Sequence, residues 1–260
     1  NDIEITMEAN PGSSEQTKFA DLRHAGVNRL SLGIQSFHPS QLEKLGRVHN
    51  SEEAFAAIHA AKLAGFSRIN LDLMHGLPDQ STEQALADLH YAINADIDHI
   101  SWYQLTIEQN TEFFRKPPIL PNEDTLSDIQ DQGFQLLQQS GFKQYEISAF
   151  FYLNQQAKHN INYWQFGDYL AIGACAHGKT TLANGDILRY QKTRTPKDYL
   201  EKSLDFVSSQ ETITGLDSLF EGLLNGLRLP QGIPTTMLLE RSACTLTQLQ
   251  TICQPLISDG

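Results

Sequence analysis

Four polar side chains stand at or near the carboxyl ends of predicted parallel strands. Glu8 ends the first predicted strand, Gln35 ends the second, and Asp72 interrupts an otherwise apolar strand. Arg47 follows a short helix predicted over 39–45. Because ligands of parallel α/β folds bind at the carboxyl ends of strands, these side chains could pair with a ligand that carries amine, carboxylate and hydroxyl groups. Local roles stay open: Glu8 could cap the next turn, Asp72 could bind loop amides, and Arg47 could cap helix carbonyls.

A second group of candidate residues lies in the segment HNINYW, 159–164, which we predict to be a loop. The neutral imidazole of His159 can be an axial ligand of haem iron. The rings of Tyr163 and Trp164 can pack against a flat macrocycle. The alternative is a structural loop in which the aromatic rings fill a gap and His159 bonds to the backbone.

The three cysteines are too far apart in the sequence for a disulfide framework or a thiolate metal site; they are Cys175, Cys244 and Cys253. The small number and wide spacing of the cysteines favour a reducing, cytoplasmic compartment. The Gly-rich segment 173–178 lacks the residues of a phosphate-binding loop. We therefore predict a buried strand over 169–178 in which Cys175 is an inert core thiol.

The composition favours a globular protein and argues against nucleic acid as a partner. The chain has 260 residues, 40% of them hydrophobic, and 19 basic against 31 acidic residues give a net charge of −12. Such an acidic chain repels a phosphate backbone. No apolar run reaches the length of a membrane span. The sequence begins within a predicted strand and stops within a predicted helix, so we expect it to be an internal piece of a longer protein.

A repeated unit predicts how the candidate residues are positioned. An amphipathic helix, a small residue followed by glycine, an apolar residue, a polar pair and a strand recur at Gly26, Gly65 and Gly141. The glycine suits the left-handed position that ends a helix. We predict an α/β fold with parallel strands over 3–8, 29–34, 69–74 and 99–106, the middle two apolar enough to be buried on both faces. A helix is predicted over 123–139, and mostly helices from 196 onward.

Seven motifs resemble the radical S-adenosylmethionine proteins of the oxygen-independent coproporphyrinogen oxidase group, with greater similarity to their haem-chaperone branch. The motifs are EANPG (8–12), AGVNRLSLGIQSF (25–37), LGRVH (45–49), INLDLMHGLPDQ (69–80), SWYQLTIE (101–108), YEISAF (145–150) and HNINYW with FGDYLAIGACAHG (159–178). The resemblance implies a partial (β/α)6 barrel whose first two β/α units are absent here, followed by a smaller, mostly helical domain. It also implies a [4Fe–4S] cluster held by three cysteines upstream of Asn1. The domains implied are a barrel part, 1–148, a family-specific extension, 149–208, and a truncated helical domain, 209–260.

The resemblance also assigns ligands to individual residues. Six positions match the family's contacts to S-adenosylmethionine: Glu8, Gln35, Arg47, Asp72, Thr106 and His177. Glu8 would face the methionine amine, Arg47 its carboxylate, and Gln35 with Asp72 the ribose. The haem ligand would be met by His159, Tyr163 and Trp164.

Two functions follow from the resemblance. The first is a haem chaperone that binds haem and delivers it to respiratory haem proteins, and HNINYW favours it. The second is an oxygen-independent coproporphyrinogen III oxidase of porphyrin biosynthesis; a different radical enzyme is a third. Peripheral association with a membrane, the oligomeric state and cleavage of S-adenosylmethionine stay open.

Overall fold

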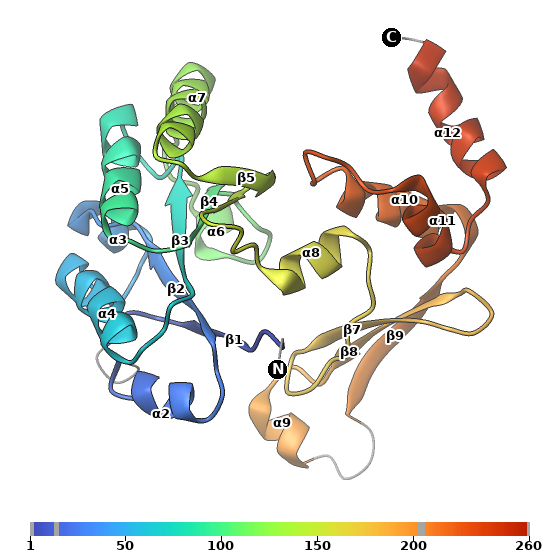
Figure 1. Ribbon diagram of the computed structural model, residues 1–260, viewed down its shortest axis with the longest axis horizontal. Coiled ribbons are helices and arrows are strands. Elements are labelled where there is room, and N and C mark those ends of the chain that lie inside the picture. The colour runs from blue at the N-terminus through green and yellow to red at the C-terminus, as the bar shows by residue number, and fades with distance from the viewer. Residues whose placement is uncertain (1–2, 13–15, 202–205, 259–260) are drawn as a thin grey trace. The chain divides into compact units, whose positions relative to one another are not determined.

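The chain folds into two compact units, the first up to Gln156 and the second from Ala157 (Figure 1). The computed structural model describes residues 3–12, 16–201 and 206–258. Within these ranges, no helix combines the length and the apolar character needed to cross a membrane.

A six-stranded sheet forms the first unit, in the order β1-β2-β3-β4-β6-β5. Its strands are β1 (Thr6–Ala9), β2 (Arg29–Gln35), β3 (Ile69–His75), β4 (His99–Gln104), β5 (Lys143–Glu146) and β6 (Ala149–Phe151). Strands β1 to β4 are parallel, whereas β6 pairs antiparallel with both β4 and β5. The four predicted parallel strands are confirmed, although β1 begins at Thr6 and β4 ends at Gln104.

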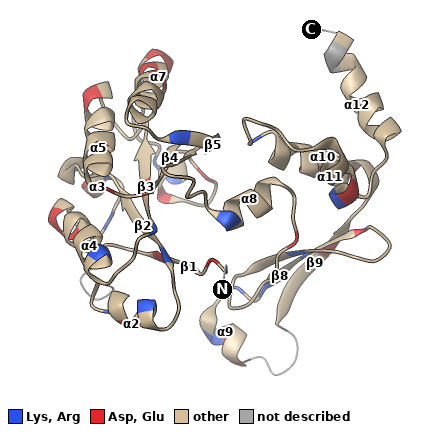
Figure 2. Ribbon diagram, viewed as in Figure 1, with Lys and Arg blue, Asp and Glu red and all other residues tan. Residues whose placement is uncertain are grey.

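Helices connect the parallel strands and cover one face of the sheet (Figure 1). They are α2 (Phe19–His24), α3 (Pro39–Lys44), α4 (Ser51–Leu63), α5 (Thr82–Asn94), α6 (Glu112–Arg115) and α7 (Glu123–Gln139). Capping boxes begin α4 at Asn50 and α5 at Ser81. Figure 2 shows acidic residues at the ends of α4, α5 and α7, where their first turns lie, as the helix dipole favours.

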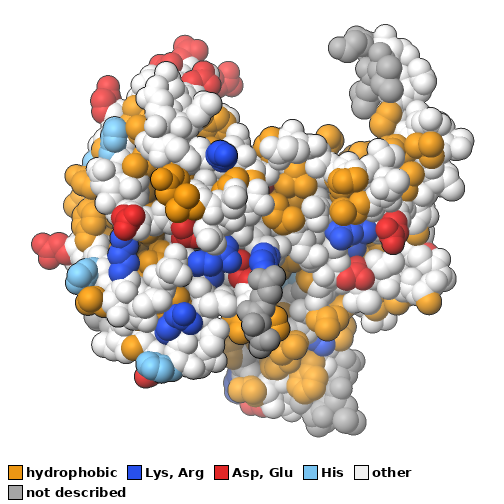
Figure 3. Space-filling model, in the orientation of Figure 1, with side chains coloured by type: hydrophobic (Ala, Val, Ile, Leu, Met, Phe, Trp, Pro, Cys, Tyr) orange, Lys and Arg blue, Asp and Glu red, His pale blue; other side chains and the backbone are white. Residues whose placement is uncertain are grey.

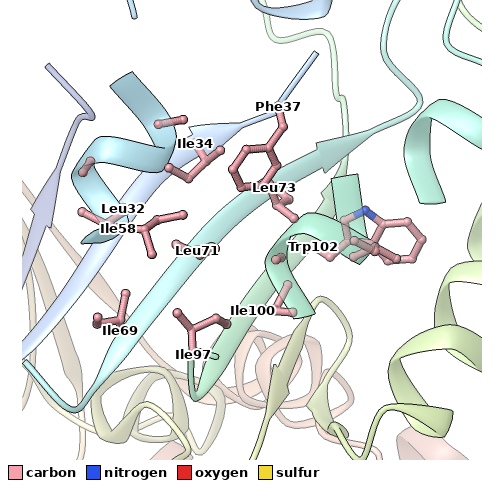
Figure 4. Close-up of a cluster of buried hydrophobic side chains, with 14 of the residues drawn as sticks. Leu32, Ile34, Phe37, Ile58, Ile69, Leu71, Leu73, Ile97, Ile100 and Trp102 are labelled. Atoms are coloured by element: carbon pink, nitrogen blue, oxygen red, sulfur yellow. The ribbon is translucent and has the colours of Figure 1, made fainter. Parts of the chain in front are cut away.

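The two faces of the parallel sheet differ sharply in chemistry. Alternate residues such as Leu32, Leu71 and Ile100 pack under α4, α5 and α7 and are fully buried (Figure 4). The positions between them carry polar side chains, which are Ser31, Asn70, Asp72, His99 and Ser101. Strands β2 and β3 are largely buried on both faces, as predicted, but only the helix-covered face is hydrophobic.

The second unit contains a three-stranded antiparallel sheet, β7-β8-β9, and five helices within its described part. Its elements are α8 (Lys158–Trp164), β7 (His177–Thr181), β8 (Ile187–Lys192), α9 (Pro196–Glu201), β9 (Val207–Ile213), α10 (Gly215–Gly226), α11 (Thr235–Ser242) and α12 (Leu246–Ser258). Figure 3 shows hydrophobic side chains on the surface over α10, whose exposed residues include Phe220 and Leu224.

Three local predictions for the second unit are wrong, and one strand was not predicted. The segment HNINYW is helical, since α8 ends at Trp164. Only a single bridge from Tyr169 to Lys179 precedes β7, so 169–176 is not a strand. Cys175 is exposed and has a left-handed φ of 63°, which excludes the predicted core thiol. Strand β9 lies in the region from 196 onward, which was predicted to be mostly helical.

One buried imidazole makes the stability of the first unit depend on pH. Burial lowers the pKa of His75 from 6.5 to about 4, and its ring packs 4.2 Å from that of Trp102. The unfolded chain therefore binds more protons than the folded chain as the pH falls from 6.5 to 4, so stability is lost over that window. Relative to His75→Phe, the wild type should lose about 3 kcal/mol of unfolding free energy between pH 7.5 and 4. Urea denaturation at both pH values measures this; parallel pH curves for the two proteins would contradict it.

Candidate functional site

The carboxylate of Asp72 lies on the polar face of the sheet, fixed by two hydrogen bonds. Ser31 Oγ on β2 donates to one carboxylate oxygen at 2.9 Å, and Asn70 Nδ2 donates to the other at 2.8 Å. Asn70 Nδ2 also donates to Ser31 Oγ at 2.7 Å. The triangle holds Asp72 in one orientation, with further lone pairs on its oxygens for a ligand.

This hydrogen-bond network continues across β4 to β5. Asn70 Oδ1 accepts from Ser101 Oγ at 3.1 Å and lies 2.6 Å from His99 Nδ1. Because an amide oxygen only accepts, His99 Nδ1 carries the proton. The other ring nitrogen of His99 lies 2.9 Å from the Tyr145 hydroxyl. The buried side chains below Asp72 are thus mutually satisfied, as buried polar groups must be.

The amide of Gln35 lies over Gly33, where a larger residue would crowd it. A Cβ at position 33 would be 3.2 Å from Gln35 Nε2 and 3.4 Å from Asn10 Oδ1. Gln35 is 4% exposed, and its Oε1 accepts no hydrogen bond of ordinary length from any described residue. An orphaned buried acceptor at the end of a strand suits a hydroxyl group of a ligand.

The Tyr103 hydroxyl interacts with all four of the predicted residues Glu8, Gln35, Arg47 and Asp72. Burial raises the pKa of Tyr103, and the negative charges of Asp72 and Glu8 raise it further. A hydrogen-bonding interaction with Gln35 and the positive charge of Arg47 lower it. Because Coulomb forces weaken with distance and screening, the charges of Glu8, Arg47 and Asp72 act on this hydroxyl from the same end of the sheet.

Tyr103 is the site residue that sequence reasoning missed. The signal was present in β4, where polar or amphipathic side chains occupy alternate positions at His99, Ser101 and Tyr103. A period of two marks one face of a strand. Thr106 is exposed and lies two residues beyond the end of β4, and its predicted contact stays a prediction.

The three residues predicted to bind haem lie on α8 in the second unit. His159 and Tyr163 are one turn apart, and their ring centroids are 6.3 Å apart. Tyr163 also contacts Tyr169 edge-on, with the centroids 4.8 Å apart. The Arg228 guanidinium lies 4.1 Å from the centre of the Trp164 ring, a cation–π contact.

A cavity of about 400 Å³ adjoins this helix within the second unit. It is lined by Tyr163, Trp164, Phe166, Gly167, Tyr169, His177, Lys179, Arg189 and Asn225. His177 therefore shares a cavity with Tyr163 and Trp164, whereas Glu8, Gln35, Arg47 and Asp72 belong to the first unit. The assignment of His177 to S-adenosylmethionine stays a prediction.

Metal-ligating groups do not gather in the described ranges. Cys175, Cys244 and Cys253 are free thiols, and no three His, Cys, Asp or Glu side chains of the described residues are placed to hold a metal ion.

Comparison with known proteins gives concordant matches. Residues 1–92 match the model of the radical SAM superfamily. The chain is 50% identical over 232 residues to the heme chaperone HemW of Haemophilus influenzae, covering 89% of this chain and 60% of that protein. It is also 50% identical over 233 residues to HemW of Escherichia coli, covering 90% of this chain and 61% of that protein. The chain thus spans about 60% of the length of these curated relatives.

A solved structure has the same fold. Coproporphyrinogen III oxidase (HemN) from Escherichia coli, a radical SAM enzyme, matches with a TM-score of 0.78 and 20% identity, over 100% of this chain and 64% of that one. At this identity the likeness concerns the fold alone, and it confirms the predicted α/β class. Taken with the sequence matches, it shows that the chain belongs to the radical SAM superfamily, in the HemN-like group near HemW.

Proposed function

We propose that this chain is the larger part of a haem chaperone that binds haem and transfers it to respiratory haem proteins in the cytoplasm or at the membrane surface. Two relatives at 50% identity carry the name heme chaperone HemW. The single observation that carries the proposal is the aromatic helix α8, which sets Tyr163 and Trp164 against a cavity.

S-adenosylmethionine would bind at the polar strand ends of the first unit. The superfamily uses this molecule with a [4Fe–4S] cluster, which supplies the electron for its reductive cleavage and would be held by cysteines outside this chain. Gln35, with its orphaned acceptor, and Asp72 suit the ribose hydroxyls. Glu8 and Arg47, both exposed at this edge, suit the amine and carboxylate of the methionine part.

Haem would bind in the second unit, against α8. The cavity offers four aromatic rings for contact with the macrocycle. Lys179 and Arg189 line the same cavity, and each is already paired with a carboxylate, Lys179 with Asp168 and Arg189 with Glu221. A haem propionate would have to share these cations with their present partners. His159 lies one turn before Tyr163 on the same helix, outside the residues that line the cavity, and would supply a nitrogen ligand to the haem iron.

Haem titration of the full-length protein tests the proposal. A Soret band should appear on stoichiometric addition of haem, and His159→Ala should weaken binding at least tenfold through loss of the axial bond. His90→Ala is the matched control, since His90 is exposed on α5 in the other unit. Haem binding by His159→Ala equal to that of the wild type would contradict the role of His159.

The second candidate is an oxygen-independent coproporphyrinogen III oxidase. The strand-end set Glu8, Gln35, Arg47 and Asp72 is compatible with it, because both functions share S-adenosylmethionine. Decarboxylation of coproporphyrinogen by the full-length protein with its cluster reconstituted would favour this enzyme over the chaperone.

A further inference from the structure

The backbone turns sharply after β2, at the residue assigned to the ribose. Gln35 has a left-handed φ of 61°, unfavourable for a residue with a Cβ, and the β2–β3 register shifts between Gly33 and Gln35. The next amide, Ser36 N, donates to Ile34 O at 2.8 Å and closes the turn. This conformation persists only if neighbouring groups hold it.

A carboxylate from α5 holds the turn from below. Asp88 is fully buried, and its two oxygens accept different donors. Ser36 Oγ donates to one at 2.8 Å, and the Phe37 amide donates to the other at 2.7 Å. Ser36 Oγ accepts in turn from the His38 amide at 3.0 Å. Asp88 therefore fixes the two residues that directly follow Gln35.

The segment after Arg47 holds the same turn from the other side. His49 Nε2 donates to Ile34 O at 3.1 Å, and Ser51 Oγ donates to Phe37 O at 2.6 Å. The Ile34 and Phe37 carbonyls and the Ser36 and Phe37 amides are thus each tied to a side chain or to the turn itself. These hydrogen bonds fix the backbone conformation on both sides of Gln35.

A buried carboxylate is an expensive way to stabilise a loop. Burial raises the pKa of Asp88 to about 6, and the hydrogen bonds from Phe37 and Ser36 together with the charge of His38 only partly oppose this. A carboxylate nevertheless does what a neutral side chain of its size cannot, since both of its oxygens accept while an asparagine has one acceptor. The free-energy cost of burying this carboxylate is explained if the conformation of the turn at Gln35 is needed for ligand binding.

We propose that Asp88 is a positioning residue, which through Ser36 and Phe37 holds Gln35 in the left-handed turn that directs its amide over Gly33 and toward the ribose of S-adenosylmethionine. The inference rests on the proposed binding of S-adenosylmethionine at the strand ends. It adds that a residue with no contact to the ligand sets the affinity through Gln35.

A double-mutant cycle in the full-length protein tests this coupling, with S-adenosylmethionine binding measured by calorimetric titration. Asp88→Asn and Gln35→Ala should each weaken binding by about tenfold, the loss of roughly one hydrogen bond. The double variant should bind no more weakly than Gln35→Ala alone, because the turn has nothing left to position. Ser36→Ala, which removes one of the two donors with little change in volume, should act in the same direction more weakly.

Asp98→Asn is the matched control. Asp98 is also a largely buried carboxylate that accepts from a backbone amide, Ile69 N, but it lies where β3 and β4 begin. Its loss should lower the melting temperature and leave the affinity unchanged. If Asp88→Asn weakened S-adenosylmethionine binding by the same factor in the wild type and in the Gln35→Ala protein, its role would be merely structural and the proposal would be overturned. An unchanged affinity of Asp88→Asn would also overturn it. Absence of binding by the wild type would instead defeat the proposed function.

Discussion

Replacement of Asp72 by alanine is expected to weaken S-adenosylmethionine binding by about 100-fold, close to 2.7 kcal/mol, as for loss of hydrogen bonds to a charged group. The carboxylate is held rigidly by Ser31 and Asn70, so a ligand hydroxyl meets an acceptor that needs no reorganisation. Asp72→Asn keeps one acceptor oxygen and should lose less, about tenfold. Calorimetric titration of the full-length protein measures both affinities.

The control for this prediction is Asp128→Ala on α7. Asp128 is exposed, so the substitution removes the same charge without touching the polar face. Its affinity should equal that of the wild type. If Asp72→Ala bound S-adenosylmethionine as tightly as the control, the site at the strand ends would be misplaced, and the role of Gln35 would fall with it.

Substitution of Gly133 by alanine is expected to destabilise the first unit by about 3 kcal/mol. A Cβ at this position of α7 would lie 2.0, 2.5 and 2.9 Å from three atoms of the Trp102 ring. Trp102 is 1% exposed and wedged between His75 and Phe134, so its ring has little room to move. The gain in helix propensity from glycine to alanine, about 1 kcal/mol, is too small to compensate. Urea denaturation gives the difference in unfolding free energy.

The same substitution in a Trp102→Phe protein tests whether contact with Trp102 causes the loss of stability. The clashing atoms belong to the outer ring of the indole, which phenylalanine lacks. Gly133→Ala should therefore cost less in a Trp102→Phe protein than in the wild type. An equal cost in both backgrounds would show that contact with Trp102 is not the reason for glycine at this position.

The first unit was largely predictable because its signals are local and repeated. Gly26, Gly65 and Gly141 all have positive φ, as the helix-ending motif requires, and α7 spans the predicted residues. The second unit was not predictable in the same way. Strand β9 is polar and mostly exposed, so it lacks the alternation that marks a strand, and α8 is a seven-residue helix containing two asparagines.

Half of the candidate site could be read from residue types and strand ends, and half could not. Charged or amide side chains at the ends of apolar strands are conspicuous, and Glu8, Gln35, Arg47 and Asp72 all influence the Tyr103 hydroxyl. Their contacts with a ligand stay a prediction. Tyr103 was missed because an aromatic residue beside Trp102 is typical of a core, although it shares a face of β4 with His99 and Ser101. Asp88 was missed because its partners Ser36 and Phe37 are about 50 positions away and meet it only through tertiary packing.

The division of the sheet into an apolar and a polar face has a consequence for evolution. Under the proposed function, neighbouring residues of one strand are under different selection. Leu71 is selected for the stability of the hydrophobic core, and Asp72 for binding of the proposed ligand. Such a sheet can change the residues of its polar face, at every second position, while the apolar residues that form its core stay the same. In a saturation library over β2, β3 and β4, positions that tolerate substitution should therefore alternate with positions that do not. Selection for protein abundance should be strict at the apolar positions, and selection for activity should be strict at the polar positions between them.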